Sequence, residues 1–112
     1  MVQSTANLRL VLSTAGSRDE AERIAHALVD AQLAACVNIV PGLHSIYRWQ
    51  GKVESADEVL LLIKTTADNL DRVESALRAA HSYDVPEFLV LTPESASEPY
   101  LRWLLESSQL AQ

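Results

Sequence analysis

Apolar positions along the chain follow two different periods, which predict an alternation of strands and helices. Short, nearly continuous runs of Val, Ile and Leu indicate strands, whereas apolar residues at i, i+3, i+4 and i+7 indicate helices. The predicted elements are strands over residues 8–14, 36–50, 52–65 and 88–92, helices over 17–34 and 66–80, and a third helix from residue 97.

The first helix carries a clear start signal. Ser17 and Glu20 form a capping box, in which the Ser17 side chain accepts from the Glu20 amide and the Glu20 carboxylate reaches back to Ser17. Ile24 and Leu28 then lie on one face, four residues apart. These signals predict a helix that ends near Ala34.

The two central strands are expected to form one long antiparallel hairpin. Gln50-Gly51 has the composition of a tight turn between them. Pro41-Gly42 interrupts the first of these strands and predicts a turn or a bulge there. Residues 58–65 form the most apolar run of the chain.

The order of elements, β-α-β-β-α-β followed by a helix, predicts an α+β, ferredoxin-like fold with an antiparallel sheet. Two helices can cover only one face of such a sheet, so its strands should alternate apolar and polar residues. Residues 59–63 and 88–91 are instead apolar on both faces, and so are Leu8, Leu10 and Leu12 with Val11. We therefore expect a second copy of the chain to cover the other face, which makes the protein a homo-oligomer.

Length and composition favour one domain over residues 1–112. The chain has 112 residues, of which 48% are apolar, and domains most often run to about 100–150 residues. An apolar fraction of this size argues against disorder. Residues 1–7 are polar, and we expect them to be frayed.

Charge and cysteine content narrow the class of protein. Nine basic and fifteen acidic residues give a formal charge of −6, which disfavours nucleic acid as a partner. The sequence contains no signal-peptide pattern and no run long enough to span a membrane, so a cytoplasmic location is expected. Cys36 is the single cysteine, which excludes a disulfide within the chain and any zinc motif built from cysteine pairs.

A few polar residues stand out as candidates for chemistry. His81 ends a predicted helix, where it is either an ordinary capping histidine or a functional group in a restricted loop. Cys36 is either a small buried hydrophobe or a nucleophile that would need a histidine and an orienting Asn or Asp. Lys64, Glu58 and Glu87 are charges within or beside apolar strands and need partners. No set of nucleophile, base and orienting residue is visible, so we do not expect an enzyme.

Five ordered blocks of the sequence closely resemble the divalent-cation tolerance (CutA) family, from about Leu8 to Glu106. The blocks are AACVNI (34–39), SIYRWQGK (45–52), EV with IKT (58–59 and 63–65), HSYDVPE (81–87) and YLRW (100–103). The resemblance implies a homotrimer of ferredoxin-like subunits, similar in arrangement to PII signalling proteins. It also implies a role in tolerance to divalent metals, copper above all, with copper binding in some members.

The family's metal site is only partly matched. Ser13 stands where some members carry a cysteine, and Ala80 stands where some carry a second histidine. The resemblance leaves His81, Cys36 and Glu87 as candidate ligands for copper or another divalent cation, gathered from adjacent subunits.

Two alternative functions remain open at the level of sequence. A PII-like trimer could sense a small anionic metabolite in a cleft between subunits, with Lys64, Tyr83 and Glu58 as candidate lining residues. A scaffolding trimer could instead recruit a partner protein through Tyr100 and Trp103 on the third helix.

Overall fold

The computed structural model describes residues 1–4 and 7–109, which fold into strands, helices and one short 3-10 helix. In chain order these are β1 (Val2–Ser4), β2 (Leu8–Ala15), α1 (Arg18–Asp30), β3 (Cys36–Trp49), β4 (Lys52–Thr66), η1 (Ala67–Asn69), α2 (Leu70–Ala80), β5 (Leu89–Leu91), β6 (Ser95–Ser97) and α3 (Glu98–Ser107).

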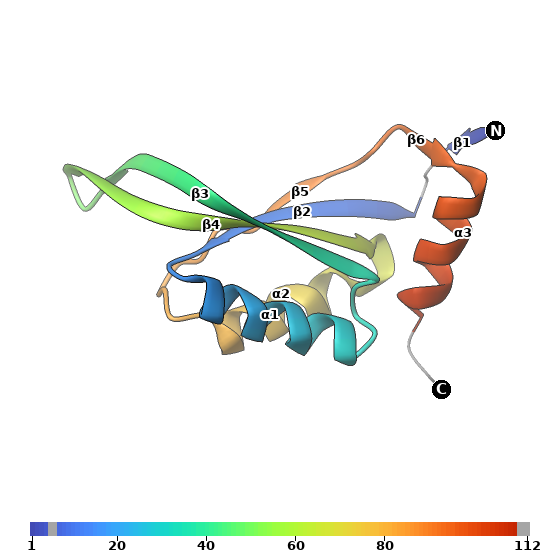
Figure 1. Ribbon diagram of the computed structural model, residues 1–112, viewed down its shortest axis with the longest axis horizontal. Coiled ribbons are helices and arrows are strands. Elements are labelled where there is room, and N and C mark those ends of the chain that lie inside the picture. Colours follow the sequence, from blue (N-terminus) through green and yellow to red (C-terminus); the bar gives the residue numbers. More distant parts are fainter. Residues whose placement is uncertain (5–6, 110–112) are drawn as a thin grey trace.

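The main sheet has four strands in the order β3-β4-β2-β5, and every neighbouring pair is antiparallel. Helices α1 and α2 lie together on one face of this sheet, and α3 lies apart from them at one end (Figure 1). The predicted α+β, ferredoxin-like order with an additional C-terminal helix is confirmed.

The core lies between the sheet and the two helices. Val11 of β2 and Ile63 of β4 pack there against Ile24 and Leu28 of α1 and Leu77 of α2, and all five side chains are fully buried. Burying one such side chain contributes about 1.5–3 kcal/mol to stability. This layer explains why the two amphipathic helices fold onto the same side of the sheet.

Helix α1 starts as predicted but ends earlier. The Ser17 hydroxyl accepts from the Glu20 amide at 3.2 Å. The last helical residue is Asp30, so the expected end near Ala34 is wrong by about one turn. Gln32 adopts a φ of 58°, and the amides after it fold back onto the last helical turn. A left-handed residue ends a helix regardless of the apolar pattern that follows.

The second helical segment begins with the 3-10 turn η1 and continues as α2 to Ala80. The last strand of the main sheet, β5, is shorter than the expected 88–92, with three residues in the ladder. Within the described part of the chain, none of the helices has the length and apolar character needed to cross a membrane.

The N-terminal residues differ from the expectation that residues 1–7 are frayed. Val2–Ser4 form β1, which pairs antiparallel with β6 in a separate two-stranded sheet. The Met1 carbonyl accepts from the Glu98 amide at 2.8 Å, at the start of α3. This contact satisfies one of the free amides that every helix N-terminus presents. Residues 5 and 6 lie outside the described residues.

The long hairpin is confirmed. Gln50 and Gly51 connect β3 to β4 with φ values of 50° and 81°, and two consecutive positive φ angles match the twist of a tight hairpin. The far half of the hairpin extends beyond the layer of helices (Figure 1).

A β-bulge at Pro41-Gly42 divides β3 into two halves. Val40 lies opposite Leu60 and Leu43 lies opposite Glu58, so β3 gains one residue relative to β4. Gly42 adopts a φ of 87° at this point. Because side chains alternate between the two faces of a strand, the extra residue reverses which residues of β3 face a given side.

The second face of the main sheet, opposite α1 and α2, is apolar and largely uncovered. Cross-strand pairing places one set of leucines together on this face, and their side chains are partly exposed. We call this set the open sheet face; it comprises Leu10, Leu12, Leu60, Leu62, Leu89 and Leu91. The predicted apolar character of both faces is therefore present in the folded chain.

Candidate functional site

His81 lies at the centre of a polar cluster at the end of α2. Its side chain has no exposed surface. The Nδ1 atom accepts from the Tyr83 amide at 3.1 Å, so the ring proton is on Nε2, which donates to the Thr14 carbonyl at 2.6 Å. Both ring nitrogens are thus occupied by backbone groups, and the histidine ties the loop after α2 to the end of β2.

Glu20 is the second member of this cluster, and its role differs from the predicted one. Its carboxylate accepts from the Ser82 amide at 2.7 Å and from the Gly16 amide at 3.3 Å, instead of reaching back to Ser17. Burial opposes ionisation, but the hydrogen bonds from Ser82 and Gly16 outweigh it and lower the pKa of this carboxyl. The sequence signal at Glu20 was local, whereas its main partner lies 62 residues away.

Tyr83 connects the loop to the hairpin. Its hydroxyl donates to a Glu58 carboxylate oxygen at 2.8 Å. Partial burial, reinforced by this bond to Glu58, raises the pKa of Tyr83 to about 12. The phenol therefore remains a neutral donor at physiological pH, and it fixes Glu58 beside the loop.

A cleft of about 800 Å³ opens between loop 82–87 and the far half of the β3–β4 hairpin. Three aromatic side chains line it, Tyr47 and Trp49 from β3 and Tyr83 from the loop. The bulge at 41–42 accounts for this arrangement, because it brings the odd-numbered residues of β3 to the same face as Glu58.

Carboxyl groups make up the charged part of the cleft lining. Glu54 and Glu58 come from β4, and Asp84 and Glu87 come from the loop. The Ser13 hydroxyl donates to the Glu87 carbonyl at 2.7 Å, which anchors the end of the loop to β2. Among the described residues that line the cleft there is no Lys, Arg or His, so its electrostatic character is that of a cation site.

Within one chain, the three residues proposed for an anion cleft between subunits do not all meet. Tyr83 and Glu58 are in contact and line the cleft. Lys64 lies six residues further along β4, which is about 20 Å for an extended strand. Its Nζ atom is 5.5 Å from the centre of the Tyr100 ring, and the Tyr100 side chain raises the pKa of Lys64 against the effect of burial.

The three predicted metal ligands also lie apart. Cys36 is opposite Lys64 at the far end of the sheet from His81, and Glu87 lines the cleft. Across residues 1–4 and 7–109, no group of three or more His, Cys, Asp and Glu side chains is placed to hold a metal ion. Within one chain, the geometry therefore does not fit a metal bound jointly by His81, Cys36 and Glu87.

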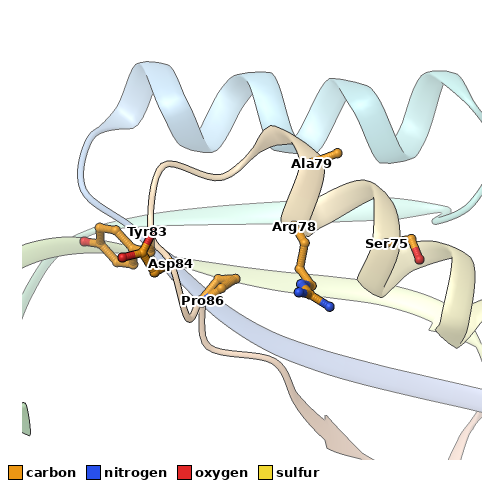
Figure 2. A pocket seen from close by; sticks show the side chains of 6 residues that line it. All are labelled: Ser75, Arg78, Ala79, Tyr83, Asp84 and Pro86. Carbon is orange, nitrogen blue, oxygen red and sulfur yellow. The ribbon is translucent and has the colours of Figure 1, made fainter.

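A smaller hollow of about 470 Å³ lies on the other side of the same loop, against α2. Figure 2 shows Arg78 and Ser75 of α2 on this side, with Tyr83 pointing away from Arg78. Arg78 is exposed and pairs with Glu74 at 3.5 Å. Tyr83 and Asp84 line both hollows, so the loop forms a wall between them.

Comparison with known proteins gives consistent matches along almost the whole chain. Residues 9–107 match the family model described as CutA1 divalent ion tolerance protein. The divalent-cation tolerance protein CutA of Thermus thermophilus is 48% identical over 99 residues, which cover 88% of this chain and 96% of that protein.

Other similar proteins include a plant relative and a solved structure. The chloroplastic protein CutA of Arabidopsis thaliana is 43% identical over 89% of this chain, and the chain spans about half of it, 55%. The structure of CutA from Synechococcus elongatus superposes with a TM-score of 0.92 at 43% identity, covering 97% of this chain and 96% of that one.

Proposed function

Because this chain belongs to the CutA1 family of divalent ion tolerance proteins, we propose that it acts in tolerance to divalent cations as a cytoplasmic homotrimer. In this proposal it binds divalent cations, with copper as the expected ion. The observation that carries the proposal is the cleft beside loop 82–87, whose charged lining residues are all acidic. The family is named for tolerance and not for a reaction.

Carboxylates suit the proposed cargo on electrostatic grounds. A cleft lined by one sign of charge raises the local concentration of ions of the opposite sign, and the formal charge of −6 on the chain adds to this effect. For a given set of nitrogen and oxygen ligands, copper(II) binds more tightly than the other divalent ions of the first transition row.

Glu87 is the predicted ligand that fits this proposal best. Its side chain is exposed and lines the cleft. His81 would have to release a backbone hydrogen bond before it could bind a metal. Because the part of one chain that the structure describes does not gather three ligands, we propose that a second copy completes the coordination of a cation held at Glu87.

The homotrimer is supported by the open sheet face. Contiguous exposed apolar surface on a small protein marks an interface, and Leu89 and Leu91 at the sheet edge are 54% and 42% exposed. A second copy packing on this face would bury it.

Calorimetric titration with copper(II) tests the proposed function. Glu87→Gln is expected to weaken binding at least about tenfold, as loss of a ligand or of its close support does in metal sites. Glu22→Gln, which removes the same charge from an exposed position on α1, should leave affinity unchanged. No binding heat in the wild type, or equal weakening by both variants, would contradict the proposal.

The same titration decides the role of His81. If its two backbone hydrogen bonds are its function, His81→Ala acts only by loosening the loop that carries Glu87, so it weakens copper binding no further when Glu87→Gln is already present. If it weakens binding further in that background, His81 is a ligand, as the family resemblance implies.

One specific observation supports the alternative of a scaffolding role. Tyr100 and Trp103 lie side by side on α3, with ring centroids 5.6 Å apart, and are 38% and 45% exposed. Exposed aromatic pairs of this kind are typical anchors of protein interfaces. A trimer structure in which both rings are buried would remove this alternative.

A further inference from the structure

The cleft beside loop 82–87 combines two features that a site for a bare metal ion does not need. One is a set of carboxylates, and the other is a set of aromatic rings. Tyr47 and Trp49 are 40% and 41% exposed although they belong to a regular strand. Large ring faces left open in a cleft are surfaces on which an organic ligand can lie.

The positions of the rings and acids place them on one surface. Tyr47 lies directly opposite Glu54 in the β3–β4 ladder, so the two side chains project from the same face as cross-strand neighbours. Tyr83 faces them from the loop, where its bond to Glu58 holds it. An aromatic ring and a carboxylate therefore adjoin each other at two points of the cleft.

This lining discriminates among ligand classes. An anion would meet four carboxyl groups and, among the described lining residues, no basic side chain. A bare metal ion would find fewer than three convergent ligands among the described residues of one chain. A protonated amine attached to a carbon chain has N–H donors for the carboxylates, and its alkyl part and charge are both attracted to ring faces.

We propose that this cleft binds a small organic ammonium ion, with Glu54 and Glu58 accepting its N–H groups and Tyr47 and Trp49 covering its carbon chain. This inference rests on the proposed function in one respect, because both take the cleft as the surface that binds cations. It adds a second class of ligand, an organic cation, to the metal ion of the proposed function.

Fluorescence of Trp49 provides a direct readout. The chain has two tryptophans, so Trp103→Phe leaves Trp49 as the single one. Three probes of equal chain length are titrated into this variant: putrescine, which is a dication, 1,4-butanediol, which is neutral, and succinate, which is an anion. Putrescine is expected to change the emission saturably, and the other two are not.

Variants in the same background locate the binding site. Glu54→Gln should raise the dissociation constant for putrescine about fivefold, the upper range for one exposed ion pair. The control Glu22→Gln should leave it within about twofold, because Glu22 is exposed on α1, pairs with Arg18 and does not line the cleft. An equal response to butanediol or succinate, no saturable response to putrescine, or equal weakening by the two variants would overturn the inference.

The outcome is separable from that of the copper titration. A protein that binds copper but not putrescine would remove this inference and leave the proposed function standing. A protein that binds putrescine but not copper would support the inference and remove the proposed metal binding.

Discussion

His81 is the residue at which family resemblance and local geometry disagree most clearly. The resemblance makes it a metal ligand, whereas in the folded chain its two ring nitrogens bond to the Thr14 carbonyl and the Tyr83 amide. A buried, doubly bonded imidazole is a structural connector. Its contacts hold the loop that carries Tyr83, Asp84 and Glu87 into the cleft.

Replacing His81 should therefore cost stability. His81→Ala leaves the Thr14 carbonyl and the Tyr83 amide without partners and opens a cavity, so we expect a loss of about 2–4 kcal/mol in the free energy of unfolding. Urea denaturation measures this loss. His26→Ala is the matched control, because the His26 side chain is 76% exposed, and its effect should stay within about 0.5 kcal/mol. Equal stability of the two variants would refute the connector role.

The sequence predicts most of the polar residues of the site, but it does not predict which residues they contact. His81, Tyr83, Glu58 and Glu87 were all candidates, because charges and histidines beside apolar strands are conspicuous. Their contacts join residues 25 to 74 positions apart, and no local rule predicts such pairs. Within one chain, Lys64 lies away from this group, since the length of β4 separates it from the loop.

At the scale of elements, sequence signals predict those features that depend only on neighbouring residues. The Ser17 cap and the Gln50-Gly51 turn appear as predicted, because each depends on neighbouring residues. The pairing of β1 with β6 joins two three-residue strands from opposite ends of the chain. A run of three residues is too short for a periodic pattern, so no sequence signal predicts this pairing.

The bulge in β3 is the element that shapes the cleft, and Gly42 is its key residue. At a φ of 87° a side chain is strained even though a Cβ atom would meet nothing within 4 Å. We expect Gly42→Val to lower the free energy of unfolding by about 1–2 kcal/mol, the cost of a left-handed L-residue. Gly42→Asn should cost less, because asparagine tolerates this region. Denaturation curves that show equal losses for both variants would contradict this account of the bulge.

At the scale of the whole molecule, the open sheet face is an apolar surface that α1 and α2 leave uncovered. Six leucines lie on it, and among the described residues neither α1 nor α2 covers them. The apolar runs of the sequence predicted this face, because a strand that is apolar on both sides needs a cover on both sides. The cleft could not be predicted in the same way, since it arises only when the bulged hairpin and loop 82–87 come together.

The central claim is that copies of this chain cover the open sheet face and form the trimer that presents the cleft. Light scattering coupled to size-exclusion chromatography at micromolar concentration tests this claim most directly. The account predicts a mass of about 37 kDa, three times the 12.3 kDa of one chain. A particle of 12.3 kDa, the mass of the single chain, would contradict it.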